Sequence, residues 1–129
     1  MDTLTTFNLK DLNLLISKAT AEGSFDHSIL TDDQGLPIAS SFSDLDQSEN
    51  EAAAISLVQR MTEKISDQFQ FTQTSEFVLH NADGKSLVIK PFRAGESNLI
   101  LSVLIPDRHT PYRRITGRII RQIKSIWAI

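Results

Sequence analysis

The residues best suited to chemistry in this chain are three histidines and a few acidic side chains. His27, His80 and His109 lie far apart in the sequence, and no two of them have the spacing of metal ligands. Asp26, His27 and Ser28 supply the three residue types of a hydrolytic triad. Neighbours on a strand point to opposite faces of a sheet, so three consecutive residues cannot form a triad among themselves. We therefore interpret them as ordinary strand residues.

Two further segments contain residues that bind ions or phosphates in other proteins. Asp32 and Asp33 lack the alternating ligands and the distal Glu of a calcium loop, which favours a turn-stabilising role. Residues 83–86, Asp-Gly-Lys-Ser, end like a phosphate-binding loop, but Leu79 stands where the first glycine is required. The chain has no cysteine, which excludes thiolate zinc sites and cysteine nucleophiles. The sequence thus predicts no catalytic residue, no metal, no cofactor and no enzyme.

The composition is that of one globular domain. The chain has 129 residues, of which 40% are hydrophobic and 22% charged, so we expect a single domain over residues 1–129 with its core over about 8–127. Its start lacks the basic and apolar runs of a signal peptide. No apolar stretch approaches the roughly 20 residues of a membrane-spanning helix. We expect a soluble, cytoplasmic protein with no stable membrane insertion.

Two helices precede the last part of the chain. The first is predicted from about Leu9 to Ala21, with Asn8 as its N-cap and Gly23 as a left-handed terminator. The second is predicted from a capping box at residues 48–51 to about Gln68. Its apolar stripe, which we expect to cover a sheet, consists of Ala54, Leu57, Val58, Met61, Ile65 and Phe69. The extra small residues Ala52 and Ala53 favour a second packing surface on this helix.

Five strands are predicted around the second helix. The first two lie near residues 25–31 and 36–42, joined by the turn residues 32–35, and Pro37 places the second strand at a sheet edge because proline cannot donate a ladder hydrogen bond. Residues 43–47 are predicted as a polar loop. Three strands near 75–81, 85–92 and 98–105 form an antiparallel meander, and the first of these could be the other edge. The fold class is therefore α+β, with one five-stranded antiparallel sheet and helices on its faces.

The final helix is strongly basic. The net charge of the chain is −3, but residues 106–129 hold six basic side chains and one acidic side chain. Pro111 is predicted in the first turn of this helix, whose apolar face packs on the sheet. Its basic face is either simply solvated, or a docking surface for a partner, or a contact for an anionic membrane or nucleic acid. Nucleic acid is disfavoured because the chain is acidic overall and no aromatic residue interleaves among the arginines.

The hairpin Leu30-Thr31-Asp32-Asp33-Gln34-Gly35-Leu36-Pro37-Ile38-Ala39-Ser40, the alanine-rich second helix from Glu51 and the meander around residues 83–84 resemble the Roadblock/dynein light chain family, particularly its bacterial GTPase-regulator members. The similarity covers about residues 8–127. It implies a profilin-like fold in the order α-β-β-α-β-β-β-α. It also implies a homodimer, or a heterodimer with a paralogous Roadblock protein, in which second helices and third strands pair.

The resemblance further implies a non-catalytic adaptor that binds and regulates or scaffolds a Ras-like small GTPase. The dimer interface implied by the resemblance comprises Ala53, Leu57, Met61, Lys64, Glu76, Phe77, Val78 and Leu79. The partner-docking residues are predicted to be Arg60, Glu63, Arg113, Arg114, Arg118 and Arg121. Two alternatives remain: a small-molecule sensory module of similar architecture, which needs a cavity between sheet and helix, and a hydrolase that uses Asp26, His27 or Asp32.

Overall fold

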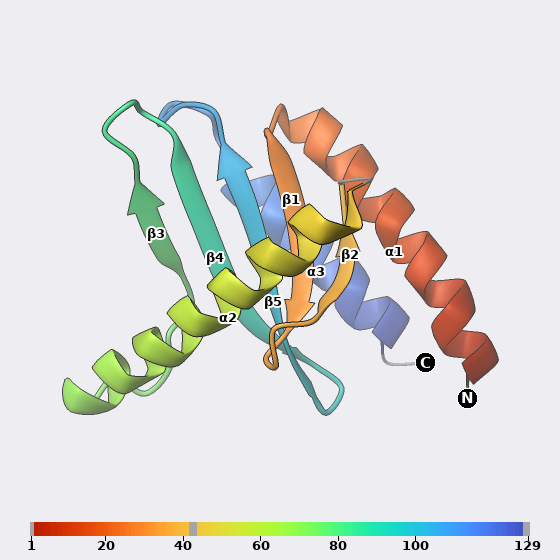
Figure 1. Cartoon of the computed structure of the whole chain (residues 1–129), viewed down its shortest axis with the longest axis horizontal. Coiled ribbons are helices and arrows are strands. Elements are labelled where there is room, and N and C mark those ends of the chain that lie inside the picture. Colours follow the sequence, from red (N-terminus) through yellow and green to blue (C-terminus); the bar gives the residue numbers. More distant parts are fainter. Residues whose placement is uncertain (1, 42–43, 128–129) are drawn as a thin grey trace.

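One five-stranded sheet separates two helical layers. In the computed structural model of the chain, residues 2–41 and 44–127 are described. Helix α2 (Leu45–Gln68) crosses one face of the sheet, and helices α1 (Asp2–Gly23) and α3 (Arg113–Trp127) cover the other face (Figure 1). The element order is α-β-β-α-β-β-β-α, so the predicted α+β fold with a single antiparallel sheet is confirmed.

The sheet has the strand order β2-β1-β5-β4-β3. Strands β1 (His27–Asp32) and β2 (Pro37–Ser40) form the first hairpin, and β3 (Phe77–His80), β4 (Ser86–Ala94) and β5 (Ser97–Ile105) form the meander. All neighbouring strands are antiparallel. The two predicted edges are confirmed: β2, which begins at Pro37, lies at one edge and β3 at the other. The predicted strand near 36–42 ends earlier, at Ser40, and Phe42 and Ser43 lie outside the described residues.

The turn between β1 and β2 uses the predicted chemistry. Asp32 accepts hydrogen bonds at Oδ1 from the backbone N–H of Gln34 at 2.9 Å and of Leu36 at 3.0 Å. Gly35 adopts a φ of +90°, which side chains disfavour. The hydroxyl of Ser56 on α2 donates to the carbonyl of Asp33 at 3.2 Å. This turn is therefore a structural contact between the hairpin and α2.

Helix α1 differs from its prediction at both ends. It begins at Asp2, so Asn8 lies inside the helix and cannot be its N-cap. The left-handed residue after the helix is Ser24, with φ 58°, and not Gly23. Gly23 is needed for another reason: a Cβ there would lie 2.6 Å from the ring of the buried Phe25. The ring, rather than the helix terminus, excludes a side chain at this position.

Two other helix starts are also corrected. Helix α2 begins at Leu45 with Asp44 as its N-cap, and the Asp44 carboxylate accepts from the backbone N–H of Gln47 at 3.3 Å. The predicted capping box is wrong, because Ser48 lies inside the helix, where its buried hydroxyl is 3.1 Å from that of Ser40. Helix α3 begins at Arg113, so Pro111 precedes it instead of occupying its first turn.

The two layers have cores of very different size. Between the sheet and α1 and α3, fifteen buried hydrophobic residues form one cluster. Between the sheet and α2, the residues whose burial the structure describes form a second cluster of five: Ile29, Ala52, Ile55, Ile89 and Ile100. Burial of apolar surface is the main stabilising term in folding. The sheet is therefore anchored chiefly by α1 and α3, and α2 lies on a thin core.

Candidate interaction surface

Helix α2 turns its large apolar side chains to solvent. The predicted stripe was expected to cover the sheet, but only Val58 packs against the core there. Leu57 is 53% exposed, Met61 56% and Ile65 50%, and Phe69 just beyond the helix is also exposed. The residues that α2 buries are mostly small or polar: Ser48, Ala52, Ile55, Ser56, Thr62 and Ser66. The spacing identified the stripe correctly, but its expected burial against the sheet is wrong.

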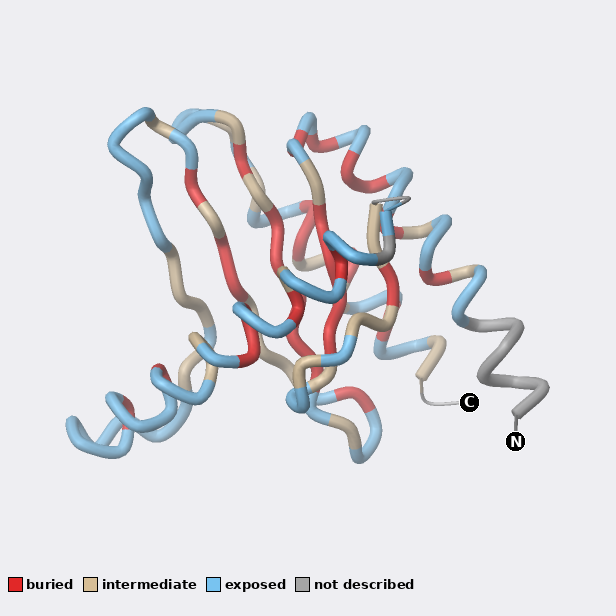
Figure 2. The backbone as a smooth tube through the Cα atoms, in the orientation of Figure 1, coloured by how far each residue is buried: buried red, intermediate tan, exposed pale blue. Residues whose placement is uncertain are grey.

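Small residues under α2 explain this orientation. Alanine and serine allow the helix backbone to lie close to the sheet, where large side chains would not fit. The C-terminal half of α2 also projects past the strands, and its surface is mostly exposed (Figure 2). Beneath the helix, the hydroxyls of Thr31 and Ser102 and the side-chain carbonyl of Gln59 are buried without a hydrogen-bond partner. The α2 interface with the sheet is therefore weak, while the outer face carries the larger apolar groups.

The edge strand β3 is a neighbour of α2, because Phe77 of β3 and Val58 of α2 pack on the same cluster. Among the described strands its four residues pair with β4 alone, so the other row of backbone groups is available for another strand. Phe77 packs in the α2 cluster, and Val78 packs in the α1 and α3 cluster. Leu79 is 57% exposed. The exposed apolar side chains therefore occur together with an unpaired sheet edge.

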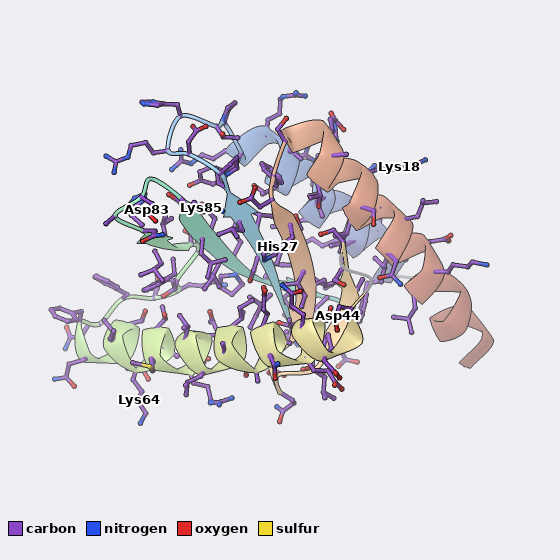
Figure 3. All side chains as sticks on the ribbon, turned by 45° about the horizontal axis from the view of Figure 1, so that its top comes forward. Lys18, His27, Asp44, Lys64, Asp83 and Lys85 are labelled. Carbon is purple, nitrogen blue, oxygen red and sulfur yellow. The ribbon has the colours of Figure 1, made fainter. Side chains whose placement is uncertain are left out.

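Most predicted interface residues fall on this surface. Ala53 and Lys64 are exposed on α2, and Lys64 points away from the sheet (Figure 3). Glu76 is the exception, because it already has partners within the chain. Its Oε2 accepts a 2.7 Å hydrogen bond from the hydroxyl of Tyr112, and it lies 3.8 Å from Lys90. Glu76 thus connects the start of β3 to the start of α3.

The contact with Glu76 alters the pKa of Tyr112. Burial and the hydrogen bond to Glu76 both raise the pKa of its hydroxyl above the ordinary 10.0. The guanidinium of Arg113 lies 5.0 Å from the centre of the Tyr112 ring and 3.7 Å from Glu76. The two ends of the contact belong to elements far apart in the sequence, so sequence patterns gave no sign of it.

The predicted docking residues do not share one surface. Arg60 and Glu63 are exposed on α2, whereas Arg113, Arg114, Arg118 and Arg121 belong to α3 on the opposite face of the sheet. Arg118 donates to Glu22 of α1 in a two-pronged ion pair, one N–H···O distance being 2.9 Å. That hydrogen bond lowers the pKa of Glu22. The two groups thus lie on different faces of the sheet, although Arg113 also lies 3.7 Å from Glu76 at the start of β3.

The residues considered for chemistry are engaged in structural contacts. His27 lies 3.0 Å from Glu51, and Asp26 pairs with Lys85 at 3.0 Å. The His80 ring lies 2.7 Å from the hydroxyl of Ser86. Within the described residues, no three histidine, aspartate or glutamate side chains gather so as to hold a metal ion. Across residues 2–41 and 44–127, no helix has the length and apolar character to cross a membrane.

A groove of about 380 Å³ lies beneath the C-terminal half of α2. Gln59, Glu63 and Phe71 line it on the helix side, and Phe92 and Arg93 line it on the sheet side. This groove between the sheet and a helix has many charged and exposed residues, unlike the cavity that a sensory module needs. Small-molecule sites are usually more apolar and more enclosed.

Known structures share this architecture. The model of the Roadblock/LC7 domain matches residues 11–104. MglB of Myxococcus xanthus is similar with a TM-score of 0.78 at 14% identity, over 93% of this chain and 90% of that one. A Roadblock/LC7 domain from Streptomyces avermitilis has a TM-score of 0.69 at 19% identity, over 88% of this chain and 92% of its own. The gliding protein MglB of Thermus thermophilus has a TM-score of 0.66 at 15% identity, over 92% and 87%.

The fold and its match place this chain in a class of small α+β domains built on one five-stranded antiparallel sheet. The family match covers most of the chain, so the chain belongs to the Roadblock/LC7 domain family. The similar structures show the same fold at low sequence identity. No curated protein matches the sequence at a significant level.

Proposed function

We propose that this chain acts as a homodimer, formed through α2 and β3, that binds and regulates or scaffolds a Ras-like small GTPase without catalytic residues of its own. Two observations carry the proposal: α2 exposes a stripe of large apolar side chains, and the neighbouring strand β3 is an edge of the described sheet. A monomer gains nothing from exposing Leu57, Met61 and Ile65 in a row. Contiguous exposed apolar surface of this kind marks interaction sites.

A second copy fits both halves of this surface. Antiparallel pairing of two β3 strands would join two five-stranded sheets and satisfy the free backbone groups. The same two-fold axis would bring the two α2 helices together, so that Leu57 and Met61 of each copy are covered. Another structure similar to this chain is described as MglB in a tetrameric arrangement, with a TM-score of 0.73 at 15% identity. Self-association in that relative supports the proposal.

The GTPase would dock on α2. Arg60 and Glu63 are exposed, and helical spacing puts them on a different side of α2 from Met61 and Ile65, so a dimer formed through that stripe would leave them accessible. Arg60 Nη1 also donates to the hydroxyl of Ser56 at 2.8 Å, which holds the guanidinium close to the helix. The family resemblance supplies the class of partner. Among the predicted docking residues, we assign this role to the α2 pair only.

The GTPase part is tested separately from the dimer. A Ras-like GTPase encoded beside this gene would be mixed with the protein, and both binding and GTP hydrolysis would be measured. The double charge reversal Arg60→Glu with Glu63→Arg should weaken binding at least tenfold while light scattering still shows a dimer. Lys18→Glu is the control, because it reverses an exposed charge on α1, in the layer on the other face of the sheet. Equal binding by the reversed variant and by the wild type would contradict the docking site.

A small-molecule sensory function is the second candidate, and the groove beneath α2 favours it. The unpaired carbonyl of Gln59 lies among the groove residues. A thermal-shift screen of metabolites tests this function. A ligand that stabilises the wild type, but not Gln59→Leu, would favour it over GTPase regulation.

A further inference from the structure

The two helical faces of the sheet carry opposite charge. Helix α3 has five basic side chains and no acidic one, whereas α2 has two basic and five acidic side chains. Helix α3 lies behind the sheet in Figure 1 and α2 in front of it. The proposed GTPase docking uses only the α2 face. The basic side chains of α3 are therefore left without a role, while its apolar side packs in the core.

The charges of α3 lie away from its buried side. Ile115, Ile119 and Ile123 face the core, and the helical spacing puts Arg114, Arg121 and Lys124 opposite them. We call Arg114, Arg118, Arg121 and Lys124 the basic face. Within the described part of the chain, only Arg118 of these four has an ion-pair partner, which is Glu22. Among the described residues the other three have no ion pair of their own, although the charge of Arg114 also helps to lower the pKa of Glu22.

The arginines at the start of α3 do not stabilise the helix, in contrast to Lys124 in its last turn. Arg113 and Arg114 lie in its first turn, at the positive end of the helix dipole, where acidic residues are favoured and none is present. Arg114 and Arg118 are four residues apart, a spacing at which like charges repel. Charges that destabilise a helix locally, and that no contact within the chain offsets, indicate a functional role.

The proposed homodimer would place both basic faces on one side. Antiparallel pairing of two β3 strands requires a two-fold axis perpendicular to the sheet, since the paired strands must share their faces. Both α2 helices then lie on one side of the joined sheet and both α3 helices on the other. The dimer would present two basic faces in one broad layer, opposite the surface assigned to the GTPase. This step rests on the proposed function.

We propose that the basic face docks the dimer on an anionic lipid surface. The basic face is extended. Its four residues line neither the groove beneath α2 nor a second groove of about 230 Å³, which lies at the start of α3 and is lined by Tyr112 and Arg113. A broad surface of like charge without a pocket suits a layer of headgroups better than a single phosphate. The apolar side of α3 is buried in the core, so binding is electrostatic and involves no insertion.

Vesicle sedimentation tests the proposal. The wild-type protein should sediment with phosphatidylcholine vesicles that contain about 30% phosphatidylserine, and not with phosphatidylcholine alone, because each basic residue near an anionic surface strengthens binding roughly fivefold. Binding should disappear when salt rises from about 0.1 M to about 1 M, which shortens the screening length from about 10 Å to about 3 Å. The double variant Arg114→Ala with Arg121→Ala removes four charges per dimer and should weaken binding at least a hundredfold.

The control removes the same charge elsewhere. Lys85→Ala with Arg93→Ala lies outside α3 and should bind anionic vesicles within about threefold of the wild type. Equal binding of the two double variants would overturn the basic face as the docking site. Preferential binding of a single-stranded oligonucleotide at the same phosphate concentration would overturn the choice of lipid.

Light scattering on the same samples separates this inference from the proposed function. A dimer that does not bind anionic vesicles overturns the lipid docking and leaves the proposed homodimer intact. A monomer overturns the homodimer, and the comparison of the two double variants then still decides whether the basic face binds lipid. A dimer that binds as expected supports both.

Discussion

Replacing Met61 by glutamate gives the sharpest test of the proposed dimer. Met61 is 56% exposed, and complete burial of such a side chain stabilises by about 1.5–3 kcal/mol, so covering its exposed half contributes about 1 kcal/mol. The two-fold axis counts this contribution twice, which gives about 2 kcal/mol per dimer. Two carboxylates placed in an apolar contact add a desolvation penalty of at least a further ~2 kcal/mol. The dissociation constant should therefore rise by roughly a thousandfold, since each 1.4 kcal/mol is tenfold.

The assay is size-exclusion chromatography with light scattering over a range of protein concentrations. Leu14→Glu is a matched control, because Leu14 is 55% exposed on α1 in the opposite layer. That variant should dimerise like the wild type. Circular dichroism should show both variants folded, since a substitution at an exposed site changes folding stability by only about 0.5 kcal/mol. A wild-type monomer at about 50 μM, or a Met61→Glu dimer of unchanged affinity, would refute the reasoning.

Three further predictions concern the fold itself. Gly23→Ala should lower the free energy of unfolding by about 1–3 kcal/mol in a urea titration, because the new Cβ meets the ring of Phe25; an unchanged midpoint would contradict the clash. Gly117→Ala should raise it by roughly 0.5–1 kcal/mol, since its Cβ meets only the flexible end of an α3 side chain; a loss of stability would show that the space is filled. Tyr112 is the only tyrosine, so ultraviolet absorbance reports its titration directly, with a midpoint above 10.0 that falls in Glu76→Gln. Because the folded state has the higher pKa, this contact stabilises the protein below pH 10 and is lost as pH rises through the folded value; a midpoint at or below 10.0 would contradict it.

The sequence predicted local structure correctly where that structure depends on residues that are neighbours in the chain. The turn at Asp32 to Gly35 follows from side chains that bond their own backbone, and the structure shows those bonds. Pro37 placed its strand at an edge because it lacks a donor. The first residues of the helices were predicted less accurately. Both Asp44 and Ser48 are residue types that act as N-caps. In the structure Asp44 caps the helix, and Ser48 lies inside it with its hydroxyl 3.1 Å from that of Ser40.

The amino-acid sequence determined the stripe on α2, the basic side of α3 and the order of the elements, since these depend on periodicity and composition alone. Only the tertiary structure decided which side of α2 meets the sheet. Its small and polar residues lie close to the strands, and the large apolar ones face outward beside β3. The same holds for the docking residues, which the sheet divides between two faces. Periodicity shows that a helix has two sides, but only packing against the rest of the chain shows which side is free.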